Sequence, residues 1–245
     1  MALHLQKIIG HRGLGGLYPE NTLTSVLEAK RTGLNWVEVD VKLSSDKHPV
    51  VFHDDTLDRT TDGSGLLADS SLAELKLLDA GRFNGLEFEN ERIPTLVELL
   101  DLCLAIKMNL NIELKPNPGQ DEETAEQVIR IIKNHDFLYK QQILFSSYSV
   151  PALSVCKRHA PLIPRGLLAR DDHEISDQTH TELEVLDCFS LHMMADHLSQ
   201  DVLASCQEKG YRVLVHTVNE ISKAQQLWDS GVTAVFSDFP IHLKA

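Results

Sequence analysis

Short apolar runs rich in β-branched residues alternate with longer amphipathic stretches along the whole chain. The apolar runs predict nine strands, at residues 7–13, 36–43, 49–54, 108–115, 142–148, 163–169, 187–193, 211–218 and 233–238. The stretches between them predict helices with clear start and stop signals. Thr95 and Glu98 match a capping box before one helix, and Gly33, Gly210 and Gly231 follow the ends of three others. This alternation predicts βα units around a parallel sheet.

The spacing of the strands narrows the fold to a closed barrel. Only about six residues (44–49) separate VEVDVKL from VVFHD, whereas a parallel crossover needs a dozen or more. We therefore expect these two strands to form a hairpin, which leaves eight parallel strands. The prediction is an α/β fold, a TIM (β/α)8 barrel, formed by residues 1–245 as a single domain.

Residues from about 44 to 93 exceed what one βα connection needs, and they predict a small cap subdomain inserted after strand 2. A short helix is expected around residues 72–78. The segment DDTLDRTTDGSG places Asp58, Thr60, Asp62 and Gly63 at the first positions of an EF-hand calcium loop. Its twelfth position is Asp69 and no helix pair flanks it, so Asx turns are the favoured interpretation. We expect the cap to lie at the barrel mouth that carries the chemistry.

Charged side chains interrupt two of the apolar strands. Glu38 and Asp40 share one face of VEVDVKL, and Glu113 and Lys115 share one face of NIELK. Taken singly, the first pair could lie on a solvated sheet face and the second could be an internal ion pair. Both faces of a parallel α/β sheet are covered, and burying lone charges is costly. One shared site at neighbouring strand ends therefore explains these residues better than separate structural roles.

The three carboxylates Glu38, Asp40 and Glu113 predict a site for a divalent metal ion. Oxygen-only ligands suit Mg²⁺, Ca²⁺ or Mn²⁺, whereas Zn²⁺ favours cysteine or several histidines. The remaining histidines show no spacing that predicts a zinc site. The expected cofactor is therefore a hard divalent cation.

Two histidines and two cations complete the candidate site. His11 and His53 stand at strand ends and could act as an acid–base pair, because the unperturbed imidazole pKa suits proton transfer at neutral pH. Each could also be a structural residue. His11 and Arg12 are expected to point to opposite sides of their strand. Three carboxylates, one dication, Arg12 and Lys115 give a net charge of +1, which a monoanionic phosphodiester would neutralise.

Composition excludes several classes of protein. The net charge of −13 argues against nucleic acid or an anionic membrane as a partner. No run of about 18 apolar residues predicts a transmembrane helix, and the first residues show no secretory signal. The four cysteines lie far apart and predict reduced thiols packed as small hydrophobes. A cytoplasmic location is expected, and the sequence leaves the oligomeric state open.

Several separated motifs together resemble the glycerophosphodiester phosphodiesterase family, from residue 7 to about residue 240. They are HRG (11–13), PENT (19–22), the E-x-D of residues 38–40, HDDTLDRTTDGSG (53–65), IELKP (112–116) and HTVN (216–219). The compact form is most similar to bacterial cytoplasmic members. The resemblance implies a TIM barrel with an inserted subdomain. It also implies hydrolysis of small-molecule glycerophosphodiesters to sn-glycerol 3-phosphate and an alcohol.

The resemblance also implies a role for each matching residue. It implies metal binding by Glu38, Asp40 and Glu113, a base at His11, an acid at His53, phosphate binding by Arg12 and Lys115, and bracing of the first turn by Glu20 and Asn21. One position departs from the family pattern. His216 stands where the family usually has an aromatic residue, often Trp, in the wall around the glycerol or head group.

Two other functions compete with this interpretation. A related enzyme could act on intact lipids, as a lysophospholipase D or a sphingomyelinase D-like enzyme does. A protein of a different class could use a catalytically inactive barrel for binding. The complete set of histidines, carboxylates and lysine argues against an inactive barrel, because buried charges are costly to retain.

Overall fold

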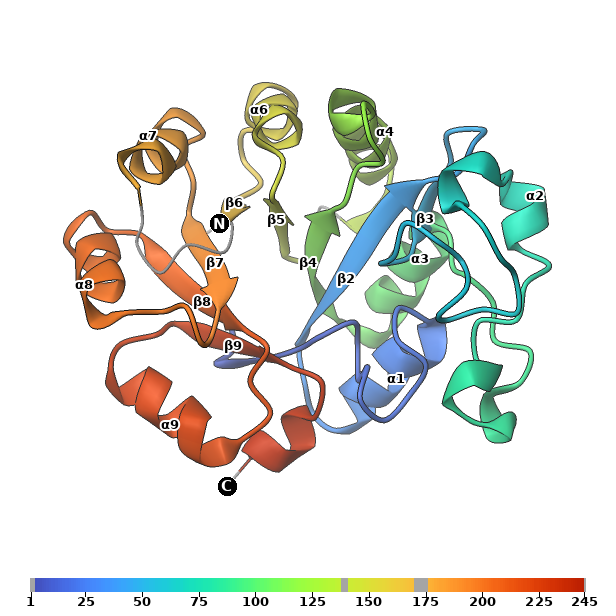
Figure 1. The fold of residues 1–245 in the computed structure, drawn as a ribbon, viewed down its shortest axis with the longest axis horizontal. Helices are drawn as coiled ribbons and strands as arrows, with labels where there is room; N and C mark the ends of the chain where they lie inside the picture. Colours follow the sequence, from blue (N-terminus) through green and yellow to red (C-terminus); the bar gives the residue numbers. More distant parts are fainter. Residues whose placement is uncertain (1–2, 138–140, 170–175, 245) are drawn as a thin grey trace.

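Eight parallel strands close into a barrel in the computed structural model, which describes residues 3–137, 141–169 and 176–244 (Figure 1). The strands are β1 (Ile8–Gly10), β2 (Trp36–Leu43), β4 (Asn109–Leu114), β5 (Ile143–Ser147), β6 (Arg165–Leu168), β7 (Ser190–Met194), β8 (Arg212–His216) and β9 (Ala234–Ser237). β1 pairs with both β9 and β2 and so closes the circle. The predicted TIM barrel is confirmed.

Helices surround the barrel (Figure 1). They are α1 (Leu23–Arg31), α3 (Leu96–Ile106), α4 (Asp121–Lys133), α6 (Val150–His159), α7 (Asp177–Val185), α8 (Gln200–Glu208) and α9 (Ile221–Asp229), and the 3₁₀ turn η4 (Pro240–Leu243) follows β9. The Thr95 hydroxyl accepts a hydrogen bond from the Glu98 amide, and the Glu98 side chain accepts one from the Thr95 amide. The predicted capping box is therefore present at the start of α3, and it satisfies two amides that the helix leaves unpaired.

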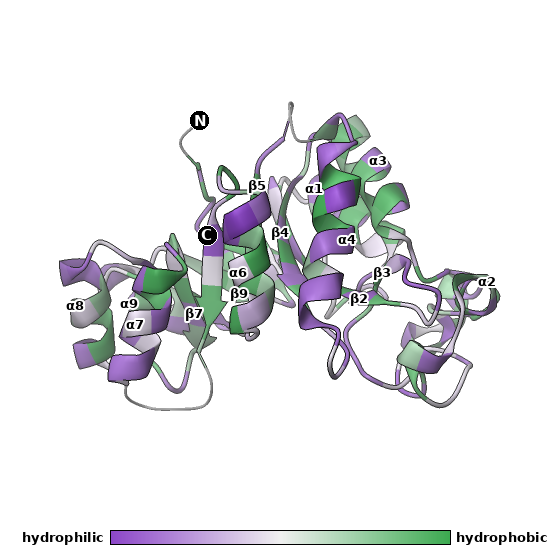
Figure 2. Ribbon diagram, turned by 90° about the horizontal axis from the view of Figure 1, so that it is seen from above, coloured by the Kyte–Doolittle hydropathy of each residue, from purple (hydrophilic) through white to green (hydrophobic). Residues whose placement is uncertain are grey.

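The segment between β2 and α3 departs from the βα pattern. β3 (Pro49–Val51) pairs antiparallel with β2, as the short connection predicted. Four short elements follow: η1 (Leu67–Asp69), α2 (Leu72–Leu75), η2 (Arg82–Asn84) and η3 (Leu86–Phe88). α2 is shorter than the helix expected at residues 72–78. The segment has a small apolar cluster of its own, which includes Phe52, Leu57 and Ile93. In Figure 2 it stands to one side of the barrel, beyond β3.

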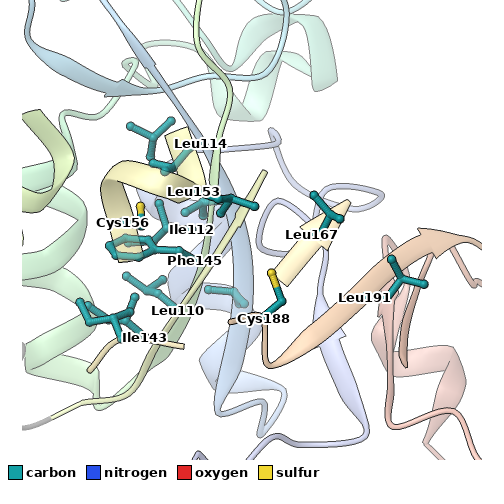
Figure 3. Close-up of a cluster of buried hydrophobic side chains, with 14 of the residues drawn as sticks. Leu110, Ile112, Leu114, Ile143, Phe145, Leu153, Cys156, Leu167, Cys188 and Leu191 are labelled. Carbon is teal, nitrogen blue, oxygen red and sulfur yellow. The ribbon is translucent and has the colours of Figure 1, made fainter. Parts of the chain in front are cut away.

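Alternation along the strands separates an outer layer from the barrel interior. Val37, Val39 and Val41 of β2 belong to the large cluster between strands and helices. Figure 3 shows the part of this cluster where strand side chains meet Leu153 and Cys156 of α6. All four cysteines are buried and reduced, as predicted. Among the described residues, no helix has the length and apolar character needed to cross a membrane.

The interior face of β2 changes character along the strand. Trp36, at the N-terminal end, packs with Ile9, Leu144 and Phe236 in an inner apolar cluster. Glu38, Asp40 and Lys42 follow on the same face and are all buried. The barrel interior is therefore apolar at one end and charged toward the C-terminal ends of the strands. This is the end at which TIM barrels carry their chemistry.

Candidate active site

Three buried carboxylates meet inside the barrel where β2 and β4 run side by side. The parallel register places Asp40 opposite Glu113 and Glu38 opposite Asn111. One ligand oxygen from each of Glu38, Asp40 and Glu113 lies within 4.8 Å of the others. The sequence prediction that these three residues converge is therefore correct.

The electrostatics of this cluster fit a bound cation. Burial and then the neighbouring carboxylates raise the pKa of Glu38 well above its usual value. Burial, with Asp40 next in importance, raises the pKa of Glu113 to about 7. Glu38 Oε1 is buried and has no hydrogen-bond partner among the described residues. A divalent cation would satisfy this oxygen and relieve the repulsion between the carboxylates.

Asp40 is the best compensated of the three carboxylates. Burial would raise its pKa, but interactions with His53, Arg12 and Lys115 outweigh burial and lower it. Asn21 donates a hydrogen bond from Nδ2 to Asp40 Oδ2 over 2.8 Å, and its Oδ1 accepts from the Asp40 amide. Asp40 is therefore held as an anion even in the absence of a metal ion.

His11 lies directly after β1 and is held by a carboxylate from the opposite end of the chain. Its Nδ1 is 2.6 Å from Asp238 Oδ1, and Asn219 Nδ2 donates to Asp238 Oδ2 over 3.2 Å. Burial would raise the pKa of Asp238, but its interactions with His11, Asn219 and Arg12 together outweigh burial and lower it. An ionised Asp238 accepts hydrogen bonds only, so Nδ1 of His11 carries the proton. Nε2 then lies on the side of Glu38, 3.9 Å from Oε2.

Arg12 does not continue the strand, and the expectation that His11 and Arg12 point to opposite sides is wrong. Arg12 has φ of 51°, in the left-handed region, so the backbone turns there instead of alternating. Its amide donates to Glu38 Oε2 over 3.0 Å, and its guanidinium lies 3.6 Å from Asp40 Oδ2. Both side chains therefore face the carboxylate cluster. Gly13 supports this turn, because a Cβ there would lie 2.3 Å from Ser25 Oγ.

Glu20 and Asn21 brace the turn as predicted. Glu20 Oε1 accepts a hydrogen bond from the Arg12 guanidinium over 2.7 Å. The Asn21 amide donates to the Arg12 carbonyl over 3.1 Å. Arg12 is thus tied at both its backbone and its side chain.

His53 follows β3 and approaches the cluster from the other side. Its Nδ1 is 2.5 Å from Asp54 Oδ1, and its Nε2 is 3.1 Å from Lys115 Nζ. Lys115 Nζ also lies 3.3 Å from Glu113 Oε1. Burial, together with the charges of Arg12 and Lys115, lowers the pKa of His53. Since a lysine ammonium can only donate, His53 Nε2 is the acceptor in its contact with Lys115.

A pocket opens beside the carboxylates. It is lined by His11, Glu38, Asn111, Glu113, Ser146, Leu168, His192, His216 and Phe236. His192 is fully buried, and its Nε2 lies 2.9 Å from Ser190 Oγ. Burial, and to a lesser extent His216, lowers the pKa of His192 to about 3. His216, at which the sequence departs from the family pattern, is also one of the residues that line the pocket.

Sequence reasoning missed the residues that hold the two histidines. Asp54 begins the segment DDTLDRTTDGSG, whose sequence favours Asx turns and gives no sign of a contact with His53. Asp238 follows the last strand in FSDFP, and its place at a C-terminal strand end was a usable signal. Arg59 and Asn219 belong to motifs that carry the family resemblance, but nothing in the sequence links Arg59 to Asp54 or Asn219 to Asp238. The contacts of Arg59 with Glu20 and of Asn219 with Asp238 join residues 39 and 19 positions apart, so local sequence patterns do not predict them.

Comparison with known proteins gives a consistent picture. The profile of the glycerophosphoryl diester phosphodiesterase family matches residues 11–242. A glycerophosphodiester phosphodiesterase of Caldanaerobacter subterraneus is 33% identical over 233 residues, which cover 95% of this chain and 94% of that protein.

Two solved structures are also similar. One is an Oleispira antarctica phosphodiesterase in complex with the product sn-glycerol-3-phosphate. It is 42% identical, with a TM-score of 0.92, over 98% of this chain and 95% of that one. The other is a glycerophosphodiester phosphodiesterase of Thermotoga maritima, 27% identical with a TM-score of 0.76, over 99% of this chain and 98% of that one. This protein belongs to the glycerophosphoryl diester phosphodiesterase family.

Proposed function

We propose that this protein is a metal-dependent glycerophosphodiester phosphodiesterase that releases sn-glycerol 3-phosphate and an alcohol by histidine acid–base catalysis. The observation that carries this proposal is one buried site in which three carboxylates lie beside two histidines, each held by its own aspartate. Membership of the family and the product bound by the Oleispira antarctica relative support the same reaction.

Glu38, Asp40 and Glu113 would hold one divalent ion, Mg²⁺, Ca²⁺ or Mn²⁺. Such an ion, when bound, draws electron density from the phosphate oxygens and stabilises charge that develops there. The backbone amide of Arg12 donates to Glu38 and Asn21 donates to Asp40, so both carboxylates keep fixed orientations. This fixed geometry supports a site built to bind a metal ion.

His11 is suited to act as the general base. Asp238 fixes the proton on Nδ1, which leaves the Nε2 lone pair for the proton of the attacking water or substrate hydroxyl.

His53 is suited to act as the acid once substrate is bound. An anionic phosphate attracts Lys115 away from His53 Nε2 and favours the protonated imidazole. His53 can then donate its proton to the leaving oxygen as the phosphorus–oxygen bond breaks.

Arg12 and Lys115 are the cations available for the phosphate. Both guanidinium and ammonium groups already lie beside Asp40, at 3.6 Å and 3.8 Å. Asp40 thus keeps both cations at the mouth of the acidic cluster, where a phosphodiester must approach the metal ion. Binding of the phosphate by these two residues explains why the site tolerates two partly buried cations next to three carboxylates.

The substrate class we propose is small, deacylated glycerophosphodiesters with several head groups. The charged groups are placed to bind the phosphate, which all such substrates share. Few contacts are left to distinguish one alcohol from another, so we expect weak selectivity for the head group. Stable membrane association and nucleic-acid binding are not part of the proposal, because the net charge of −13 opposes both. A cytoplasmic location and a single-domain chain with a cap remain predictions.

A substrate panel tests this function. Purified protein is incubated with glycerophosphocholine, glycerophosphoethanolamine and a micellar diacyl phospholipid, with Mg²⁺ or Ca²⁺ and with EDTA. We expect release of sn-glycerol 3-phosphate from the two soluble diesters, and its loss with EDTA. Faster cleavage of the diacyl lipid would favour the phospholipase alternative, and no turnover of any substrate would favour an inactive, binding barrel.

A further inference from the structure

The guanidinium of Arg59 joins two loops of the site. One follows β1 and carries Arg12 and Glu20, and the other follows β3 and carries His53 and Asp54. Its Nη1 and Nη2 donate to the two oxygens of Glu20 over 2.7 and 2.8 Å. Its Nε and Nη2 donate to the two oxygens of Asp54 over 2.6 and 2.8 Å. Arg59 therefore makes two bidentate contacts, one with each carboxylate. This arrangement uses the planar fork of donors that only arginine has.

Each of these carboxylates also holds a residue of the proposed reaction. Asp54 Oδ1 accepts from Arg59 and also contacts His53 Nδ1. Glu20 Oε1 accepts from Arg59 and also from Arg12. The chain of contacts thus runs from Arg12 through Glu20, Arg59 and Asp54 to His53. It connects residues that lie more than 40 positions apart in the sequence.

Charge explains why the arrangement depends on Arg59. The Glu20 and Asp54 side chains are only 13% and 21% exposed, whereas Arg59 is 46% exposed. Removing Arg59 would leave two partly buried carboxylates on neighbouring loops without their shared cation. Its hydrogen bonds to Glu20 and Asp54 raise its own pKa, and the bond from Arg59 is the main cause that lowers the pKa of Asp54. Arg59 thus keeps Asp54 ionised and fixed behind His53.

We propose that Arg59 is a positioning residue, which sets the orientations of His53 and Arg12 together through Asp54 and Glu20. The proposal rests on the proposed function, because it assigns Arg59 a part in the alignment of the acid and of one phosphate-binding group. Arg59 itself does not touch the reacting atoms. His11 has a separate support, through Asp238 and Asn219, and does not depend on Arg59.

The proposal predicts a specific pattern of defects. A misplaced His53 matters most when the leaving group is a poor one, since an alkoxide needs a proton and p-nitrophenolate does not. A misplaced Arg12 weakens substrate binding for both substrates. Loss of Arg59 should therefore lower kcat for glycerophosphocholine far more than for glycerol p-nitrophenyl phosphate, and it should raise KM for both.

Arg59→Ala and Arg59→Lys are compared with wild-type protein on these two substrates. We expect Arg59→Ala to lower kcat for glycerophosphocholine about 30- to 100-fold, and for the p-nitrophenyl substrate about 3-fold or less. Arg59→Lys should recover little, because an ammonium cannot make two bidentate contacts. Millimolar guanidinium should restore part of the activity of Arg59→Ala but none to Arg59→Lys, whose side chain fills the space.

Arg82→Ala is the matched control. Arg82 lies in the same inserted segment, is 61% exposed and contacts Glu89 over 3.0 Å. It should change neither substrate's kinetics. Thermal unfolding of every variant shows whether the fold is retained.

The outcomes separate this proposal from the proposed function. No turnover by wild-type protein would overturn the proposed function and this proposal with it. Wild-type turnover with nearly unchanged kinetics in Arg59→Ala would overturn the positioning role alone. Equal losses on both substrates, without rescue by guanidinium, would show that Arg59 merely stabilises the fold, and would also overturn it.

Discussion

The two halves of the pocket wall differ in charge. The half formed by β2, β4 and the turn after β1 contributes His11, Glu38 and Glu113 to the pocket. The half formed by β6 to β9 contributes Leu168, His192, His216 and Phe236. In the first half each charged group has an ionic or hydrogen-bonded partner. In the second half rings pack against rings, with the His192 and Phe236 centroids 5.3 Å apart.

From this difference we expect the two halves of the pocket wall to serve different functions. In the proposed function, the charged half would bind the metal ion, move protons and hold the phosphate, because it combines carboxylates and an imidazole with the neighbouring cations Arg12 and Lys115. The ring-lined half offers shape and two imidazoles, of which His192 is kept neutral by burial. We therefore expect substitutions in the first half to abolish turnover and substitutions in the second half to adjust substrate binding or stability.

The largest effect is expected at the acidic cluster. Glu113→Gln should lower kcat/KM on the order of 10⁴-fold, because a weakened metal site forfeits several kcal/mol of transition-state stabilisation. It should also abolish most of the thermal stabilisation that Mg²⁺ or Ca²⁺ gives the wild-type protein. Glu123→Gln, an exposed carboxylate on α4, is the control and should behave as wild type. Wild-type turnover in Glu113→Gln would refute the metal assignment.

A large but substrate-dependent effect is expected at His53. His53→Ala should cost about 10²–10⁴-fold in kcat with choline or ethanolamine as the leaving alcohol. The loss should be much smaller with p-nitrophenolate, which leaves without a proton. His48→Ala, an exposed histidine of the same segment, provides the control. Equal losses on both kinds of leaving group would argue that His53 is not the acid.

A smaller effect is expected in the ring-lined half. His216→Phe restores an aromatic residue at the position where the family usually has one. Because His216 lines the pocket and is not one of the three carboxylates of the cluster, we expect KM to change about 2- to 10-fold, with kcat nearly constant. Steady-state kinetics with glycerophosphocholine and glycerophosphoethanolamine measure this. A loss of kcat as large as that of Glu113→Gln would show that the two halves are not functionally distinct.

The smallest effect on turnover, but a clear one on stability, is expected at His192. Its folded-state pKa of about 3 lies below the unfolded value near 6.5. As the pH falls from 6.5 toward 3, the unfolded state gains a proton that the folded state excludes, so this residue destabilises the fold progressively. His192→Gln should flatten the fall in Tm over that range. An unchanged slope of Tm against pH would contradict the buried, neutral state.

The same contrast explains how much the sequence could predict. Buried charges on apolar strands are conspicuous, so Glu38, Asp40, Glu113 and Lys115 were found, and the short link before β3 predicted the barrel. The turn at Arg12 was not foreseen, because a non-glycine residue with positive φ leaves no pattern in the sequence. Strand alternation ends with β1 at Gly10 and does not extend to His11 and Arg12.

Long-range contacts were the other source of error. Asp238 reaches His11 across 227 positions, and Arg59 joins Glu20 to Asp54, yet each residue alone looks like an ordinary loop residue. The pocket-lining role of Asn111 and Ser146 depends on register between β4 and β5, which local periodicity does not fix. The grouping of the three carboxylates was therefore predictable, and much of the hydrogen-bond network around them was not.

The most direct test measures metal content and turnover in the same samples. Metal-free protein is titrated with Mn²⁺, and bound metal per chain is determined alongside release of sn-glycerol 3-phosphate from glycerophosphocholine. We predict that turnover is absent at the start, rises in proportion to bound metal, and reaches its maximum at about one ion per chain, as a three-carboxylate site requires. Full turnover by the metal-free protein, or binding of metal without any gain in turnover, would contradict the account.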